Sequence, residues 1–378
     1  METLSASRKP LVSAEEEIRW KQLWSLAALY ASIIIGWIAY QNYQPKLLLQ
    51  FQFTDFTFSL IFVQGLIVTI TPIIAGRLGD RYRFQQGHRL PIISTGISFA
   101  AMVFMAVAFT LLGNPGEVFK WVLPVLIVLW LVAMSIFTSP ALSTMELFTP
   151  VDKLPRAMAI LTITGNLVYA LEPVIVDIID YLGAPVTFMV GGVVVFLSGY
   201  ALKKNSLGLF RQSGDQERGA HESEMLKSPY LFIFFIGLSV GVATTFLFDW
   251  FPLLPGQKLG AALDTTGTFI VVGILIFSAI ISWPMGNVVN RHGLNRSFWI
   301  SLSAIALSAL AMYLTSATVP LFLLTVVFGI AYTSISVASL PLAINRAAFS
   351  QKVFCVGIFF SGAALPQGVW EAWAAYSS

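Results

Sequence analysis

Charged residues are scarce in this chain of 378 residues. Asp, Glu, Lys and Arg make up 11% of the sequence, against roughly 25% in an average soluble domain. Hydrophobic residues make up 57%. A chain with so few charges has too little polar surface to face water on all sides, which excludes an ordinary soluble protein. We therefore expect a lipid bilayer as its solvent and partner, and no nucleic acid.

Cysteine and histidine are also nearly absent. The one cysteine, Cys355, lies inside an apolar run, so no intramolecular disulfide can form. The three histidines, His88, His221 and His292, fall in polar stretches, where they cannot relay protons across the middle of a membrane. No cluster with metal-ligand spacing, nucleophile arrangement or phosphate-binding glycine loop is present. We expect no cofactor, no metal and no enzymatic activity.

Long apolar runs are the main feature that the sequence does contain. Each is about 20 residues long, enough to cross a bilayer, and must be helical because its backbone groups need partners within the segment. No cleavable signal peptide is evident, because residues 1–21 are polar and the next run is long enough to span. Eleven runs occur, at residues 22–43, 56–76, 91–112, 120–145, 156–179, 184–202, 229–251, 266–286, 297–315, 319–343 and 353–375.

The basic residues fix the expected orientation. All but three of the 22 Lys and Arg fall on one side of the membrane if the N-terminus is cytoplasmic. The exceptions are Lys46, Lys120 and Lys258. We expect a multi-pass protein of the inner or plasma membrane. Its expected divisions are a cytoplasmic N-terminal segment (1–21), a six-helix bundle (22–202), a flexible polar linker (203–228) and a five-helix bundle (229–378).

Two basic stretches repeat at equivalent places in the two halves, each at the end of an apolar run. The first covers residues 76–91 as a predicted loop and the second covers residues 286–296. Such repetition indicates two homologous bundles in tandem, as in many secondary transporters. The matched pairs are Gly76 with Gly286, Asp80 with Asn290, and Arg81 with Arg291. On this alignment the second bundle lacks a partner for the sixth span, through a natural end or a truncation.

The stretch Gly76-Arg-Leu-Gly-Asp80-Arg81 resembles the signature between the second and third helices of the major facilitator superfamily. Its continuation to Pro91 is similar to the loop of the glycoside/pentoside/hexuronide and sucrose transporter branch, with His88 where that pattern has arginine. The resemblance implies an all-α membrane protein with two pseudo-symmetric bundles, here 6 + 5 helices. The resemblance to this branch rests on the loop alone. Cation-coupled members of the branch carry aspartates in the second helix, whereas the second span here has only Gln64. A sodium site of that kind is therefore in doubt.

The resemblance also implies a conformational latch at this loop. Asp80 would accept hydrogen bonds from the free amides of the helix that begins near Gln351 or Lys352, and so hold the outward-open state. Arg81 and Arg83 would pair with Glu146. Alternatively, the arginines only mark the cytoplasmic side. In the repeat, Asn290 replaces the acid, so the second latch is expected to be weaker or absent.

Charges inside apolar spans are the candidates for transport chemistry, because burying one in hydrocarbon costs at least ~2.5 kcal/mol. Glu172, beside the helix-distorting Pro173, is the leading candidate for accepting a proton or binding substrate. The alternative is a carboxylate at the outer interface in water, like Asp177 and Asp180. Asp249 and Glu371 are expected at the outer interface.

Uncharged polar side chains in the spans could bind a solute with hydroxyl groups and an apolar ring face. Any one of them could instead bond helix to helix. They are Tyr30, Tyr40, Gln41, Asn42, Gln64, Asn166, Trp250 and Gln367.

We interpret the chain as a secondary active transporter that moves a small polar organic solute by alternating access. A sugar or glycoside is slightly favoured, H+ coupling through Glu172 is the mechanism to test, and a monomer is expected. The alternative is a non-transporting relative with the same fold, such as a membrane assembly factor, a sensor or a truncated remnant.

Overall fold

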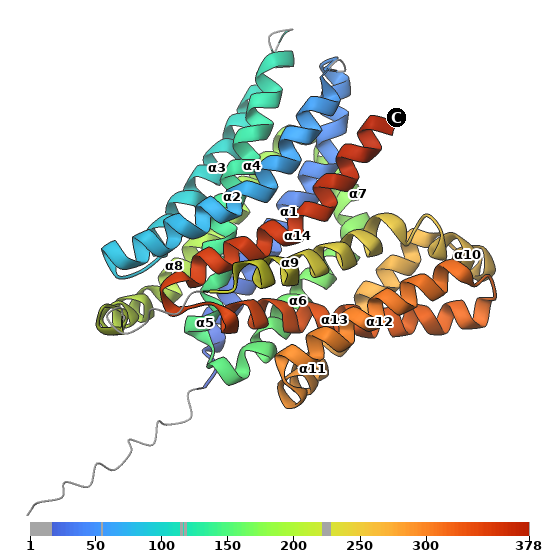
Figure 1. Cartoon of the computed structure of the whole chain (residues 1–378). Helices are drawn as coiled ribbons and strands as arrows, with labels where there is room; N and C mark the ends of the chain where they lie inside the picture. The colour runs from blue at the N-terminus through green and yellow to red at the C-terminus, as the bar shows by residue number, and fades with distance from the viewer. Residues whose placement is uncertain (1–16, 54–55, 114–115, 117–118, 221–227, 378) are drawn as a thin grey trace, which may run out of the picture.

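The computed structural model describes residues 17–53, 56–113, 116, 119–220 and 228–377, and all regular elements in these ranges are helical (Figure 1). In chain order they are α1 (Trp20–Gln50), α2 (Thr57–Gln86), α3 (Leu90–Leu112), α4 (Phe119–Ser143), α5 (Met145–Phe148), η1 (Val151–Lys153), α6 (Leu154–Ala170), α7 (Glu172–Leu182), α8 (Ala184–Ala220), α9 (Tyr230–Thr245), η2 (Phe246–Trp250), α10 (Pro255–Leu263), α11 (Gly267–His292), α12 (Leu294–Leu314), α13 (Thr318–Arg346), η3 (Phe349–Gln351) and α14 (Lys352–Ser377).

The described residues contain ten helices that are long and apolar enough to cross a membrane. An eleventh crossing arises if the pair Val151–Ala170 and Glu172–Leu182, which is bent by 57°, counts as one span. The bend lies at Leu171, directly before Glu172 and Pro173. Proline cannot donate a backbone hydrogen bond and clashes with the preceding turn, so the break lies where the sequence predicts a kink.

The loop predicted over residues 76–91 is mostly helix, which corrects the sequence analysis. Helix α2 continues to Gln86, and Gly87 ends it with a left-handed φ of 80°. Helix α3 then begins at Leu90, with Pro91 in its first turn. The prediction ended the helix where the apolar run ends, but a helix that leaves hydrocarbon can continue in water with charged residues on its surface.

The linker predicted over residues 203–228 also begins as helix. Helix α8 continues to Ala220, so the first part of this segment is not a flexible tether; residues 221–227 lie outside the described part. The Lys and Leu residues after position 201 have good helix propensity, and the preceding turns supply the nucleus that a helix needs. The short helix α10, between η2 and α11, has no counterpart in the predicted spans because it is too short to cross a membrane.

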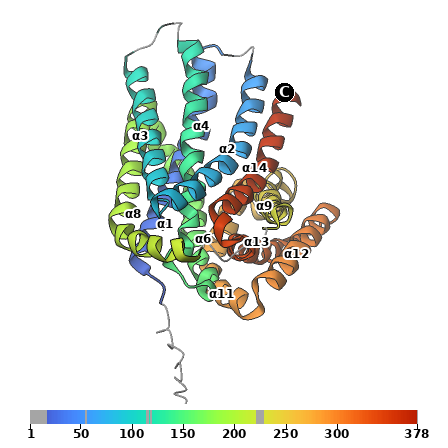
Figure 2. The same ribbon diagram turned by 60° about the vertical axis from the view of Figure 1, so that its left-hand side comes forward.

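The helices form two groups that meet along two seams. We call α1–α8 the N-half and α9–α14 the C-half. One seam joins α2 to α14 and the other joins α6 to α11. Figures 1 and 2 show α2, α3 and α4 running at a wide angle to α11, α12 and α13, while α14 lies beside both α2 and α9.

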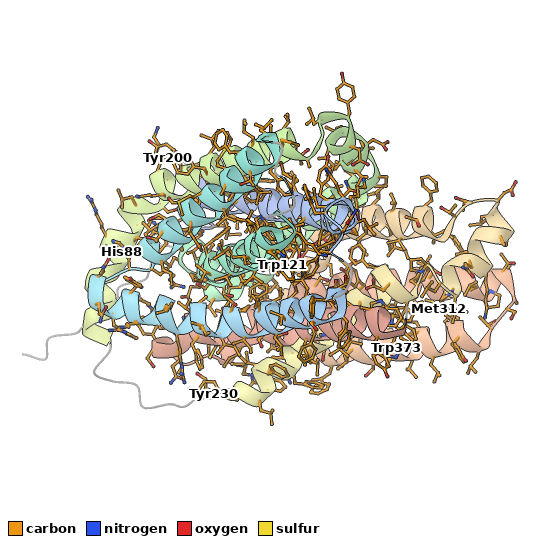
Figure 3. The ribbon with its side chains drawn as sticks, turned by 90° about the horizontal axis from the view of Figure 1, so that it is seen from above. His88, Trp121, Tyr200, Tyr230, Met312 and Trp373 are labelled. Atoms are coloured by element: carbon orange, nitrogen blue, oxygen red, sulfur yellow. The ribbon has the colours of Figure 1, made fainter. Side chains whose placement is uncertain are left out.

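We call the end of the molecule that carries the α2–α3 turn and α5 the inner end, and the end that carries α7 and α10 the outer end. Seen from above in Figure 3, His88 in the α2–α3 turn lies on the side opposite Met312 in α12. Aromatic rings fill the interior of both halves. Tyr40 stacks on Trp130 at 4.5 Å in the N-half, and Phe328 lies 5.3 Å from Phe246 in the C-half.

Candidate functional site

The inner end of α2 holds the first turn of α14. Asp80 is 7% exposed. Its Oδ1 accepts a hydrogen bond from the backbone N–H of Val353 at 3.2 Å, and its Oδ2 accepts one from Phe354 at 2.8 Å. These amides have no partner within their own helix, and a carboxylate is the acceptor that the positive helix end favours. The contact is the one that the family resemblance implies, at a helix that begins at Lys352.

Arg83 binds the residue just before this helix. It is buried, donates a hydrogen bond from Nη1 to the carbonyl oxygen of Phe349 at 2.9 Å, and lies over the Phe349 ring at 4.3 Å from its centre. A guanidinium can do both at once because it combines directed donors with a flat face. Asp80 and Arg83 therefore hold two consecutive parts of the C-half, the first turn of α14 and the η3 turn that precedes it.

Glu146 in α5 joins two positive charges from opposite halves. Its Oε1 lies 2.6 Å from Nη2 of Arg89, and both side chains are almost fully buried. Its Oε2 lies 2.7 Å from Nζ of Lys352 in the C-half. Arg89 also donates to Oγ of Ser143 at 2.7 Å. With Arg83 and Asp80, which are also in electrostatic range, the cluster contains three cations and two carboxylates.

The predicted partners of Glu146 were wrong in part. Arg81 is exposed to solvent, so it cannot pair with a buried carboxylate. Arg83 lies within electrostatic range of Glu146, but its hydrogen bond from Nη1 goes to Phe349. The direct ion pairs of Glu146 are with Arg89 and Lys352. The sequence did contain a sign that Arg89 has a structural role, because Arg89 is the last basic residue before an apolar run. The pairing of Lys352 with Glu146 depends on how the halves meet, which no local pattern encodes.

Close backbone approach explains the glycines of this seam. A Cβ added to Gly76 would lie 2.6 Å from the carbonyl oxygen of Val353 and 2.7 Å from Cα of Phe354. Further along, a Cβ on Gly65 would meet Cα of Gly368 at 3.3 Å. Ring contact between Phe58 and Tyr376 at 6.0 Å continues the seam to the outer end. Helices α2 and α14 therefore stay in contact along their whole length.

The repeated motif in the second half makes a different contact. Gly286 packs against Pro155 and Arg156 at the start of α6, and Nε of Arg156 donates to Oδ1 of Asn287 at 2.7 Å. Asn290 and Arg291 are both exposed. Asn290 does not take the place that Asp80 has at α14, in keeping with the expectation of a weaker or absent second latch.

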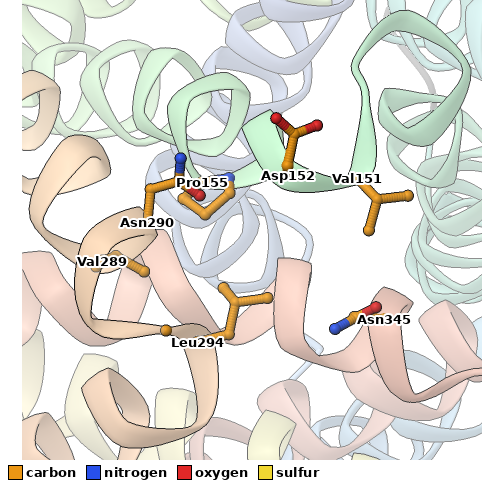
Figure 4. Close-up of a pocket in the computed structure, with 8 residues that line it drawn as sticks. Val151, Asp152, Pro155, Val289, Asn290, Leu294 and Asn345 are labelled. Carbon is orange, nitrogen blue, oxygen red and sulfur yellow. The ribbon is translucent and has the colours of Figure 1, made fainter. Parts of the chain in front are cut away.

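Asn290 instead lines a cavity of about 520 Å³ at the inner end, between the start of α6, the α11–α12 turn and the end of α13. Figure 4 shows the side chains of Asp152, Asn290 and Asn345 around it.

At mid-height, Asn166 bonds the two halves together. The residue is buried and donates from Nδ2 to Oγ of Ser278 at 2.7 Å, and Ser278 also accepts from Oγ1 of Thr333 at 2.7 Å. All the polar groups involved are buried. In this conformation Asn166 therefore acts as a helix-to-helix contact, the alternative that the sequence left open.

Three tyrosines from both halves lie within electrostatic range of one another, and one of them, Tyr169, follows Asn166 by three residues on α6. Tyr169 of α6 has Tyr30 of α1, Tyr332 of α13 and Glu172 of α7 within electrostatic range. Sequence reasoning included Tyr30 but missed Tyr169 and Tyr332, because a tyrosine in an apolar run resembles any other core aromatic. Glu172 is half-exposed at the bend between α6 and α7. The four side chains offer hydroxyl groups and one carboxylate where the two halves meet.

Towards the outer end, the remaining predicted residues divide into two groups. Asn42 donates to Oδ1 of Asp180 at 2.8 Å, where Lys46 also pairs at 2.8 Å, and Gln41 is exposed. Neither Gln41 nor Asn42 is joined to the other half by these contacts.

Gln64, Tyr40 and Gln367 form the second group. Gln64 is buried and accepts from Nε2 of Gln44 at 2.9 Å, while its own Nε2 is buried without a partner. The hydroxyl of Tyr40 is likewise buried without a partner. Gln367 of α14 donates to Oε1 of Glu371 at 3.0 Å. Of these side chains, Gln64 and Tyr40 have a buried donor without a partner, and Tyr40 lines a small apolar cavity inside the N-half with Trp130 and Phe188.

Comparison with known proteins places this geometry in a family. The profile of the Major Facilitator Superfamily matches residues 26–370. No curated protein sequence matches the chain significantly. Among solved structures, the human organic anion transporter MFSD10 (TETRAN) superimposes with a TM-score of 0.68 at 11% identity, over 95% of this chain and 94% of that one.

The proton:xylose symporter XylE, solved with bound 6-bromo-6-deoxy-D-glucose, superimposes with a TM-score of 0.64 at 12% identity, over 94% of this chain and 88% of that one. At such identities these two likenesses show the fold alone, whereas the profile match covers most of the sequence. The chain belongs to the Major Facilitator Superfamily.

Proposed function

We propose that the protein is a secondary active transporter that moves a small polar organic solute by alternating access. The observation that carries the proposal is the contact between Asp80 and the first turn of α14, at 2.8 and 3.2 Å. It joins the halves at the inner end, and towards the outer end the helix pair α6 and α7 is bent by 57° at Leu171. A contact of this kind stabilises one arrangement of the halves and must break in the other.

The inner contact acts as a latch in this proposal. It consists of Asp80, Arg83, Arg89, Glu146 and Lys352, with Gly76 allowing the approach of the helices. The charge-assisted bonds hold the inner end closed while the outer end admits the solute. We place the inner end in the cytoplasm, because nearly all Lys and Arg residues lie there by the predicted topology.

Glu172 is the proposed proton-coupling residue. It lies at the bend between α6 and α7, and Tyr169 is the hydroxyl-bearing neighbour within electrostatic range. A carboxylate that alternates between the protonated and ionised forms could couple proton movement to the change of arrangement. The proposed solute contacts are Tyr30, Tyr40, Gln64, Asn166 and Gln367. The loop over residues 76–91 favours a sugar or glycoside among polar solutes.

Thermal unfolding of the purified protein against a panel of sugars, nucleosides and organic acids would identify the solute, because a ligand that binds the folded state raises its melting temperature. A solute that stabilises the protein should then exchange by counterflow in proteoliposomes faster than in protein-free liposomes. Stabilisation without any exchange would contradict transport and would favour a non-transporting sensor.

A further inference from the structure

The second copy of the repeated motif packs against its neighbouring helix in the same way as the first copy. A Cβ added to Gly286 would lie 3.1 Å from the carbonyl oxygen of Pro155 and 3.3 Å from Cα of Arg156, at the start of α6. A Cβ added to Gly76 would meet atoms of the same two kinds at the start of α14. At the inner end, α11 therefore meets α6 as α2 meets α14.

The bonds that Asp80 makes have no counterpart at the second copy, for two reasons. Asn290, which matches Asp80, carries no charge and is exposed. Val353, whose amide is one of the two that bond Asp80, is matched by Pro155, which has no N–H to donate. The α6–α11 side of the inner end therefore lacks the carboxylate-to-amide bonds that join α2 to α14.

The cavity of about 520 Å³ lies on this less bonded side and is lined from both halves. Asp152 comes from the N-half, whereas Asn290 and Asn345 come from the C-half, and Figure 4 shows Asn290 and Asn345 on different sides of the opening. All three side chains are exposed, and within the described residues none of them has a hydrogen-bond or ion-pair partner. Cavities of roughly 300–1,000 Å³ accommodate small molecules.

The lining of the cavity suits a ligand with several hydroxyl groups. A carboxylate accepts hydrogen bonds and a carboxamide both donates and accepts them, which matches the mixed bonding of hydroxyls. The rest of the lining includes apolar side chains, which can cover the carbon–hydrogen face of a ring. They belong to Val151, Pro155, Val289 and Leu294.

The charges around the cavity favour a neutral ligand. Among the described residues that line it, Asp152 alone is charged, and it would repel an anion. Lys153 and Arg291 adjoin lining residues in the sequence and would oppose a cation. A neutral solute with hydroxyl groups avoids both kinds of repulsion.

We propose that this cavity binds a neutral polyhydroxylated solute from the cytoplasmic side and thereby holds the inner end closed. Its polar groups come from both halves, so a motion that opens the inner end would separate them and release the ligand. Binding therefore stabilises the closed inner end to the extent that affinity differs between the two arrangements. Solute that accumulates in the cytoplasm would then slow further uptake. This regulatory step rests on the proposed function, whereas the binding step does not.

The test of binding is isothermal titration calorimetry of the purified full chain with three sugars that share one ring. They are methyl β-D-glucopyranoside, D-glucuronate and protonated D-glucosamine, which are neutral, negative and positive. We expect the glucoside to bind about tenfold more tightly than either charged sugar. Asn345→Ala and Asp152→Ala should each weaken glucoside binding about tenfold, the effect of one lost hydrogen bond.

A matched variant separates the site from general effects. Asn295→Ala removes an exposed carboxamide of α12 outside the cavity lining and should leave glucoside affinity unchanged. No glucoside binding, equal affinity for the three sugars, or unchanged affinity in both cavity variants would overturn the site. Tighter binding of glucuronate would overturn the assignment to a neutral ligand.

Regulation is measured in proteoliposomes as the initial uptake of the solute that the thermal panel identifies, with and without the glucoside inside. The glucoside should slow uptake by the wild type and leave uptake by Asn345→Ala unaffected. Equal slowing of both proteins would contradict the regulatory role. Glucoside binding that Asn345→Ala weakens, together with no uptake by the wild type, would support the site and contradict the proposed function.

Discussion

Glu146 is the residue on which the charge balance of the inner contact depends most. It is the carboxylate partner of Arg89 within the N-half and of Lys352 from the C-half, at 2.6 and 2.7 Å. A buried pair of this kind adds little net stability, yet the loss of one partner is costly because the other charge stays buried. The side chain of Arg89 is 1% exposed and has no route to water without a change in the packing.

The substitution Glu146→Gln should therefore destabilise the protein by about 3 kcal/mol. The expected readout is a clearly lower melting temperature in detergent. Glu17→Gln, which removes an exposed carboxylate, is the control and should leave the melting temperature within error of the wild type. Equal melting temperatures for Glu146→Gln and the wild type would show that Arg89 does not depend on this partner.

The proposed proton coupling depends on the carboxylate of Glu172. Glu172→Gln keeps the shape of the side chain but cannot gain or lose a proton, so accumulation of solute against a gradient should stop while counterflow exchange continues. Both are measured in proteoliposomes with a solute that the thermal panel identifies. Asp177→Asn, five residues further along α7, should leave both unchanged. Uphill accumulation by the Glu172→Gln variant would remove Glu172 from the coupling mechanism.

Among the residues of the site, sequence reasoning found those that a local motif marks. Asp80 and Gly76 belong to one such motif, and the structure has them in contact with α14. Lys352 and Tyr332 carried no such mark, because their roles depend on residues brought close only by the fold. Asn42 was misleading for the opposite reason: it looks polar and buried in the sequence, but it bonds Asp180 within its own half.

At the scale of the helices, the seam between α2 and α14 depends on glycine. Gly76 lies against the backbone of Val353 and Phe354, and Gly357 of α14 lies against the carbonyl oxygen of Pro72. The backbones approach so closely that even a methyl group has no room. In a bilayer such close approach is a main source of attraction between helices, since lipid leaves little hydrophobic driving force between them.

Gly76→Ala should push α2 away from α14 and weaken the bonds of Asp80. We expect a loss of about 1–3 kcal/mol, as for other overpacked contacts. Gly208→Ala in α8 is the matched control, because a Cβ there meets nothing within 4 Å and alanine stabilises a helix by roughly 0.5–1 kcal/mol relative to glycine. The melting temperature of Gly208→Ala should equal or exceed that of the wild type, and the melting temperature of Gly76→Ala should be lower. The reverse order would contradict the packing described.

The helices themselves were the most predictable elements. Apolar runs place the membrane spans to within a few residues, as for α3, predicted at residues 91–112 and found at Leu90–Leu112. The ends failed where a helix continues into water, as α2 and α8 do. Hydropathy reports where the lipid ends, whereas hydrogen bonding and propensity decide where the helix ends.

At the scale of the whole molecule, the contacts that join the two halves differ between the inner end and the outer end. The inner end has Asp80, Arg83 and the Glu146 cluster, while the contacts towards the outer end include those between aromatic rings, Phe58 with Tyr376 and Tyr169 with Phe248. The internal repeat predicts two bundles, but not which conformation they adopt. That choice depends on the balance between the inner contacts and whatever closes the outer end, a difference of a few kcal/mol.

The most direct test of the rocking motion is a pair of distances measured by double electron–electron resonance in a Cys355→Ser background. Spin labels at Val151→Cys and Leu231→Cys report the inner end, and labels at Tyr181→Cys and Leu263→Cys report the outer end; all four positions are exposed. With Asp80→Asn added, we predict that the inner distance lengthens while the outer distance shortens. Unchanged distributions at both ends, or lengthening at both, would contradict alternating access through this latch.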